Sequence, residues 1–272
     1  MLRSFAMGFR RSIGGWTAAL SFAVFLTPLP LVLAAGRRLP LWDPGEVMRI
    51  IYEAVDPVVP MGALGMLGIL PLFFALLVGA YSTKDEPSKV PSRPAYLLGR
   101  FTGHAAVLSA AAFASVLLGF LILVHFGAAF SDDLLKAVLT TGALFSLVVL
   151  QLLALGYLIS TLSEEGSVCL VTALSAGFVL LIMIPMAVTF LFMLEYAPMG
   201  ELVKSPAVVR EEMWRYLTLY LPFEPTLQMG EALGEAGTWR GLLNVLNLGV
   251  FSVVYIIIAA LRFSRGKGPG SP

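Results

Sequence analysis

The sequence predicts an all-α integral membrane protein with six transmembrane helices. Hydrophobic residues make up 58% of the 272 residues and charged residues only 13%, whereas soluble domains average about 25% charged residues. The mean hydropathy is +0.88. The charged residues are also unevenly distributed, because all of them lie between six long apolar stretches. Composition and distribution together exclude an ordinary soluble fold.

The six apolar stretches are long enough to cross a bilayer. A transmembrane helix needs about 20 apolar residues, because the hydrocarbon core is about 30 Å thick and each residue rises about 1.5 Å. None of the stretches contains Asp, Glu, Lys or Arg, as expected where a charge at the bilayer centre costs at least about 2.5 kcal/mol. We therefore expect a single membrane-spanning domain over residues 1–272, with spans at residues 13–35, 60–80, 105–126, 138–162, 168–194 and 242–261.

The distribution of basic residues predicts that both termini are cytoplasmic. One side of the predicted membrane carries 10 basic and 4 acidic residues, and it consists of the N-terminus, residues 81–104, the turn 163–167 and the tail from Arg262. The opposite side carries 8 basic and 13 acidic residues, and it consists of residues 36–59, 127–137 and 195–241. Lys and Arg accumulate in the cytoplasmic loops of membrane proteins. The first of these two sides is therefore expected to be the inner one.

Residues 1–12 are predicted to form a short interfacial helix before the first span. One face carries the apolar side chains of Leu2, Phe5, Ala6 and Phe9. Basic side chains that can reach lipid headgroups are Arg3, Arg10 and Arg11. A cleaved signal peptide fits less well, because its apolar core runs for about 7 to 15 residues and the stretch 13–35 is longer.

The long outer segment 195–241 is expected to contain a second amphipathic helix. Its apolar residues recur at helical spacing, as Val209, Met213, Tyr216, Leu217 and Tyr220. Aromatic side chains favour the headgroup region of a bilayer. We expect this helix to float at that level on the outer surface.

Several kinds of chemistry are excluded by the residues present. The net charge of +1 gives no basic excess that would attract nucleic acid. His104 and His125 are 21 residues apart on one predicted helix, which separates them by about 30 Å, so both are interpreted as interfacial histidines and not as a zinc pair. No G-x-x-x-x-G-K-[ST] sequence exists, and the chain itself should not bind ATP. We expect no metal, no cofactor and no catalytic residue in this chain.

The energy for any transport would have to come from a partner. Proton or sodium coupling usually places an ionisable group near the midplane of the membrane, and the predicted spans contain no acidic or basic residue. A cytoplasmic ATPase is the natural source of that energy.

Three local segments carry a family resemblance: residues 90–100 (VPSRPAYLLGR), residues 155–160 (LGYLIS) followed by Ser163, and residues 262–265 (RFSR). With the predicted topology, they resemble the type-2 ABC exporter permeases, the family that includes the permease of the nitrous-oxide-reductase maturation transporter. One departure is that only residues 82–87 precede the first segment where the family has a longer coupling helix. Either the coupling helix of this chain is short, or the ATPase docks on residues 93–100.

The resemblance implies a permease that couples ATP hydrolysis in a separate cytoplasmic ATPase to export across the plasma membrane. ATP and Mg²⁺ would be bound by that ATPase, and the expected further partners are a second permease copy or homologue and membrane lipids, with no nucleic acid. The uniformly apolar spans mildly favour a lipid-like or amphipathic cargo over a highly charged one. The residues implied in ATPase coupling are Pro91, Ser92, Arg93, Tyr96, Arg100, Glu164 and Glu165.

Two other functions remain open at the level of sequence. The first alternative is a non-transport membrane scaffold or accessory protein, which the absence of a neighbouring ATPase gene would favour. The second is an intramembrane hydrolase, since Glu211, Glu212 and Arg215 superficially resemble the motif of prenyl-protein peptidases. Both histidines lie upstream of this motif, and the motif lies outside the predicted spans.

Overall fold

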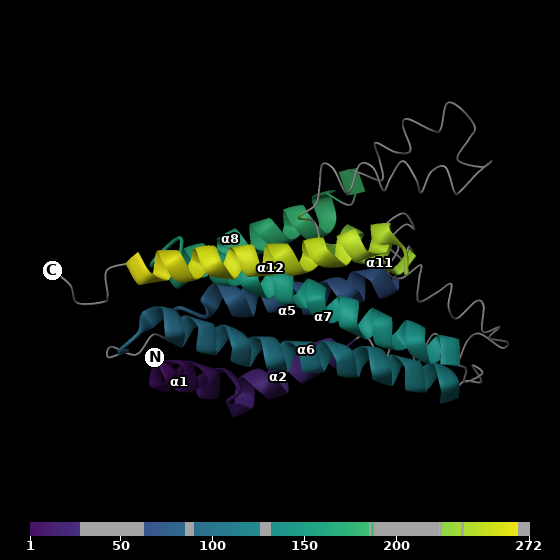
Figure 1. The fold of residues 1–272 in the computed structure, drawn as a ribbon, viewed down its shortest axis with the longest axis horizontal. Coiled ribbons are helices and arrows are strands. Elements are labelled where there is room, and N and C mark those ends of the chain that lie inside the picture. Colours follow the sequence, from purple (N-terminus) through teal and green to yellow (C-terminus); the bar gives the residue numbers. More distant parts are fainter. Residues whose placement is uncertain are drawn as a thin grey trace.

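The computed structural model describes residues 1–27, 63–84, 90–125, 132–184, 186–187, 223, 225–234 and 237–265. All regular elements in these ranges are helices, which confirms the all-α prediction. They are α1 (Leu2–Ser12), α2 (Gly15–Leu26), α5 (Ala63–Tyr81), α6 (Arg93–His125), α7 (Asp132–Ser160), α8 (Gly166–Phe178), the π-helix η1 (Val179–Met183), α11 (Pro225–Gly234) and α12 (Trp239–Arg265). The longer helices run side by side along one axis (Figure 1).

Among the described residues, four helical stretches are long and apolar enough to cross a membrane. They are Arg93–Leu121, Val138–Ser160, Gly166–Met183 and Trp239–Arg265. Two shorter apolar helices, Trp16–Leu26 and Ile69–Tyr81, lie within the first and second predicted spans. Residues 28–35 and 60–62 of those spans lie outside the described residues. The membrane-spanning character is thus supported, and the count of six spans stays a prediction.

Two helices begin earlier than the spans predicted from hydropathy. α6 begins at Arg93 and not at Ala105, which Pro94 permits because a proline in the first helical turn loses no intrahelical hydrogen bond. α7 begins at Asp132 and not at Val138, and an acidic residue at this position complements the positive end of the helix dipole. Charged residues ended the predicted spans, but the helices continue through them.

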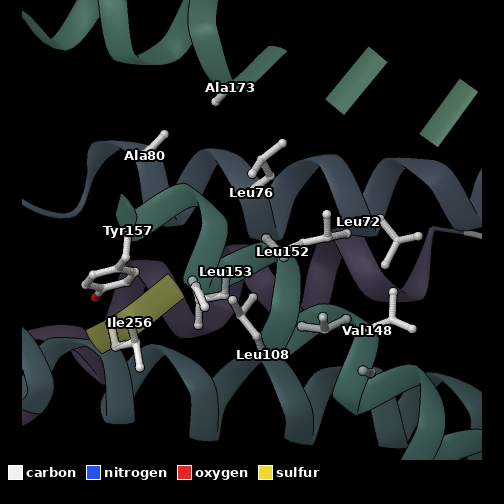
Figure 2. Packing of buried hydrophobic residues seen from close by; sticks show 14 of the residues in the cluster. Leu72, Leu76, Ala80, Leu108, Val148, Leu152, Leu153, Tyr157, Ala173 and Ile256 are labelled. Carbon is white, nitrogen blue, oxygen red and sulfur yellow. The ribbon is translucent and has the colours of Figure 1, made fainter. Parts of the chain in front are cut away.

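The core of the bundle forms around α7. Within the apolar stretch of α7, 56% is buried, compared with 28% for α6 and 22% for α8 and α12. Figure 2 shows residues of α7 surrounded by side chains from α5, α6 and α12. The labelled residues of these four helices are Val148, Leu152, Leu153, Tyr157, Leu72, Leu76, Ala80, Leu108 and Ile256. α7 is therefore the central helix, whereas α6, α8 and α12 expose much of their apolar surface.

α5 and α7 cross at a pair of glycines. A Cβ atom built on Gly79 would lie 2.9 Å from the Cα atom of Gly156, and one on Gly156 would lie 2.9 Å from the backbone nitrogen of Ala80. Real Cβ atoms do not come so close to other backbone atoms. Small residues permit this close approach of helices in membranes, and here they bring the ends of α5 and α7 together.

The first helix and the end of the last helix lie at the same end of the bundle (Figure 1). We call this the α1 end. It also contains the first turns of α6, the last turn of α7 and the start of α8 (Figure 1). The chain enters α2 at this end and leaves α12 at the same end. The number of crossings from α2 to α12, both included, is therefore even, which agrees with six spans. Which side of the membrane this end faces stays a prediction.

The outer segment 195–241 is described only in part. The predicted amphipathic helix around Val209 to Tyr220 lies outside the described residues, as does Pro185. The helix α11 belongs to the same segment and packs against α7 and α12. The side-chain amide of Gln151 on α7 donates a hydrogen bond to the carbonyl oxygen of Phe223 just before it (2.8 Å). This part of the segment thus packs into the bundle, and it does not float free at its surface.

Candidate functional site

At the α1 end, α1 packs on the first turns of α6 through small residues. Ser4, Gly8 and Ser12 form its buried face, and the backbone N–H of Ser92 donates to the hydroxyl of Ser4 (3.2 Å). A Cβ atom on Gly103 would lie 2.7 Å from the Cβ atom of Ser12, so the two helices are in close contact. The predicted N-terminal helix therefore exists, and its polar face of small residues is the one that contacts protein.

The opposite face of α1 carries the apolar and basic residues expected of an interfacial helix. Leu2 is 86% exposed and Phe5 is also exposed, and Arg3, Arg10 and Arg11 are exposed as well. This arrangement leaves apolar side chains free to contact lipid. The position of α1 relative to a membrane stays a prediction.

Five of the predicted coupling residues lie at or near the protein surface at the α1 end. Pro91 is exposed and Ser92 is partly buried just before α6. The guanidinium of Arg93 lies over the ring of Phe263 on α12, 4.5 Å from its centroid, which is a cation–π contact. Glu164 and Glu165 are exposed in the turn between α7 and α8. Arg93 thus links the start of α6 to the last turn of α12.

Lys84 links the end of α5 to the turn that bears these glutamates. Its ammonium group donates to the carbonyl oxygen of Ser160 (3.0 Å) and to that of Ser163, and the hydroxyl of Thr83 also donates to Ser160 (2.9 Å). The last carbonyl groups of a helix have no partner within the helix, and a cation there complements the helix dipole. Sequence reasoning counted Lys84 only as one of the inner basic residues.

The other two predicted coupling residues are buried. Tyr96 is 1% exposed and Arg100 is 8% exposed. His104 follows at the same helical spacing and is 4% exposed, and its Nδ1 atom is 2.8 Å from the hydroxyl oxygen of Tyr157 on α7. The ring of Phe101 packs edge-on against Tyr157, at 5.4 Å between ring centroids. His104 thus lies inside the protein between α6 and α7, and its depth in a membrane stays a prediction.

The structure thus divides the predicted coupling residues into two groups. Pro91, Glu164 and Glu165 are accessible at the surface, while Tyr96 and Arg100 belong to a buried polar cluster between α5, α6 and α7. That cluster, completed by His104, Tyr157 and Ser82, could have been recognised in part, because residues 96, 100 and 104 recur every four positions on an apolar helix.

A family model described as ABC-2 family transporter protein matches residues 91–267, which is more than half of the chain. The chain belongs to the ABC-2 transporter family. It is therefore a transmembrane permease component of an ABC transporter, and the resemblance to type-2 ABC permeases is confirmed at the level of the family. No curated protein matches the chain in sequence. The matched region begins at Pro91 and includes all seven predicted coupling residues.

The permease also contains buried polar side chains, both in its spans and in α11, that sequence reasoning missed. Gln151 is 2% exposed, Gln228 and Asn244 are fully buried, and the amide of Asn247 donates to the side-chain oxygen of Gln228 (3.3 Å). These amides connect α7, α11 and α12. The description of the spans as uniformly apolar is therefore wrong, because a search for charges alone does not detect neutral amides.

Proposed function

We propose that this permease works with a separate cytoplasmic ATPase and uses its ATP hydrolysis to export a substrate from the cytoplasm. The family match carries this proposal, since the matched family consists of transport subunits. ATP and Mg²⁺ would be bound by the ATPase, and the chain would need no cofactor of its own. The proposal includes a location in the plasma membrane and a second permease copy or homologue as partner. A particular similarity to the permease of the nitrous-oxide-reductase maturation transporter stays a prediction.

We propose that the ATPase docks at the α1 end of the bundle. Pro91, Glu164 and Glu165 are exposed there, so they can contact a partner directly. Tyr96 and Arg100 are buried, and any effect they have on coupling would pass through the position of α6. One ATPase that contacts Pro91 before α6 and the two glutamates before α8 would reach both α6 and the turn before α8.

The contacts of Lys84 and Arg93 support a mechanical path for coupling. Lys84 is bonded to carbonyl groups at the end of α7, and Arg93 contacts Phe263 on α12. These two residues flank the segment 85–92 on either side. A displacement of that segment by the ATPase would therefore pull on α7, the central helix, through Lys84 and on α12 through Arg93.

Pull-down of co-expressed ABC ATPases from the same genome tests the docking proposal. Glu164→Lys with Glu165→Lys reverses two exposed charges at the proposed interface, and we expect it to reduce ATPase recovery at least about tenfold, which corresponds to about 1.4 kcal/mol. Asp132→Lys is the matched control, because Asp132 is exposed on the first turn of α7 at the opposite end of the bundle. Equal loss in the control, or full recovery with the double variant, would contradict docking at this turn.

Arg93 provides a second test. If the charge of Arg93 serves only to attract lipid headgroups, then Arg93→Lys should leave ATPase association in detergent unchanged, because the charge is kept. If its planar guanidinium is needed, either for docking or for the contact with Phe263, then Arg93→Lys and Arg93→Glu should both weaken association. Phe263→Leu separates these two roles, since it removes the aromatic ring and leaves the arginine. Normal association of Arg93→Glu would eliminate docking through this residue.

A further inference from the structure

In the buried polar cluster at the α1 end, two nitrogens of the Arg100 guanidinium have no hydrogen-bond partner among the described residues. Arg100 is 8% exposed, and the two nitrogens are its Nε and Nη1 atoms. The hydroxyl group of Tyr96, one helical turn earlier, is also buried without a partner among these residues. A guanidinium stays protonated in proteins, and an unpaired buried charge is strongly unfavourable. An acceptor for these two nitrogens would therefore stabilise the cluster.

The surroundings of Arg100 are rich in hydrogen-bond donors. His104, Tyr157 and Ser82 are buried, and the Nδ1 atom of His104 is 2.8 Å from the hydroxyl oxygen of Tyr157. The nearest helix on the other side is α1, whose Gly8 faces the backbone of Tyr96 and Arg100. Hydroxyl, imidazole and guanidinium groups are thus all buried at the α1 end of the bundle.

No carboxylate of the described residues balances this charge. Glu164 and Glu165 are exposed in the turn after α7. The remaining described acidic residues lie on the first turn of α7 and on α11, which are at the opposite end of the bundle (Figure 1). Asp85 and Glu86, close in sequence to Ser82, lie outside the described residues, so the acceptor is either a carboxylate of that segment or a bound ligand.

We propose that Tyr96, Arg100 and Tyr157 form a binding site for an oxyanion, the phosphate or carboxylate head group of an amphiphilic molecule. A planar guanidinium with two free nitrogens matches two oxygens of such a group, and a tyrosine hydroxyl can donate to a third. The apolar tail would lie along the exposed apolar surfaces of the neighbouring helices. The oxyanion site does not rest on the proposed export function, and its test requires no ATPase.

The site is closed in this structure. The unpartnered nitrogens of Arg100 are covered by protein, and α1 lies over the backbone of both Tyr96 and Arg100. An oxyanion would enter when α1 moves away from α6. The contact between these helices uses small residues and one hydrogen bond between Ser92 and Ser4, and the exposed face of α1 carries Leu2 and Phe5, which can contact the tail of an amphiphile.

Binding by the full chain in detergent tests the proposal with three probes: inorganic phosphate, phosphatidylglycerol and oleate. Retained phosphatidylglycerol is counted by native mass spectrometry, and the temperature of unfolding is followed as each probe is titrated. Ligands that bind only the folded state raise that temperature. The variants are Arg100→Gln and Tyr96→Phe, and the control is Arg262→Gln, which removes an exposed positive charge on the last turns of α12 at the same end of the bundle.

We expect phosphatidylglycerol or oleate to raise the unfolding temperature of the unaltered chain and of Arg262→Gln equally. Arg100→Gln should bind at least about tenfold more weakly, and Tyr96→Phe several-fold more weakly. Without any probe, Arg100→Gln should unfold at the same temperature as the unaltered chain or at a higher one, because it removes an uncompensated buried charge. If Arg100→Gln does not fold, Arg100→Lys takes its place. This substitution keeps the positive charge and removes the planar guanidinium, so it too should bind the probes more weakly.

The three probes distinguish the source of the oxyanion. A response to phosphate as well as to phosphatidylglycerol supports a site for the anionic group alone, and a response to the amphiphiles only supports a site that also needs the tail. An equal response of Arg100→Gln and the unaltered chain would place binding on other basic residues and overturn the proposal. The absence of a response to all three probes would overturn it as well.

Discussion

Lys84→Met is the most direct test of the contacts that hold the α1 end together. The substitution keeps the length and apolar character of the side chain and removes its ammonium group. In the structure this group donates to the carbonyl oxygens of Ser160 and Ser163. The turn that carries Glu164 and Glu165 should therefore lose its attachment to the end of α5.

The expected magnitude follows from these two hydrogen bonds. A hydrogen bond to a charged group contributes about 1.5–3 kcal/mol, but Lys84 is only partly buried, so solvent weakens both. Ordering a lysine side chain costs up to about 2 kcal/mol. The net loss on substitution is therefore about 1–3 kcal/mol in the free energy that opens the turn, which corresponds to an increase of about 5- to 150-fold in the exchange rate of its amides.

Hydrogen–deuterium exchange of the purified chain measures this effect locally. A peptide covering residues 161–167 should exchange faster in Lys84→Met, whereas peptides of α11 should be unchanged. Thr83→Val removes only a neutral hydrogen bond to Ser160, so its effect should be smaller, about 0.5–1.5 kcal/mol. Arg3→Met is the control, since Arg3 is exposed on α1. Unchanged exchange of residues 161–167 in Lys84→Met would refute the reasoning.

Three further predictions concern packing, orientation and ATP. Gly156→Ala should lower the free energy of unfolding by about 1–3 kcal/mol, because the added Cβ meets the backbone of α5. Gly249→Ala is the control, since Gly249 has open space around it, and it should be neutral or slightly stabilising. Equal unfolding temperatures of the two variants would contradict the close crossing of α5 and α7 at their glycines. In a Cys169→Ala background, cysteines at Glu164 and Ser264 should be shielded from an impermeant thiol reagent in intact cells, and one at Asp132 should react; the reverse pattern would overturn the orientation. The purified chain alone should bind no ATP, and saturable binding would contradict this.

The structure also bears on how orientation should be measured. Ser82 lies in the connection predicted to be inner and is a natural choice for labelling from sequence alone. It is 2% exposed, and its hydroxyl donates to the carbonyl oxygen of Gly79 (2.6 Å). A cysteine there would resist labelling on either side of the membrane. Ser264 and Glu164 are exposed, so shielding of these positions reports on the membrane itself.

Hydropathy predicted the helical class and the approximate positions of the described helices, because every apolar stretch must satisfy its backbone within a helix. It could not predict where α6 and α7 begin. Arg100 and Lys136 are the charged residues nearest to the predicted starts of these spans, and they ended the spans in the sequence, yet a helix in a membrane can continue past the hydrocarbon core. The sequence also could not predict that α11 packs on α7, because this contact depends on the buried amide of Gln151 and a backbone carbonyl.

The buried site marks a different limit of sequence reasoning. Arg100 was counted with the inner basic residues, for which the positive-inside rule predicts contact with lipid headgroups. What buries its surroundings is the close packing of α1 on α6, and the residues responsible are visible in the sequence as small residues four positions apart, Ser4, Gly8 and Ser12 on one helix and Gly99 and Gly103 on the other. Such spacing predicts that two helices approach closely. It does not say which helix is the partner, and the rule for basic residues considers charge without considering packing. A basic residue beside such a pattern is therefore better interpreted as a candidate for burial, and a buried arginine in turn requires an acceptor.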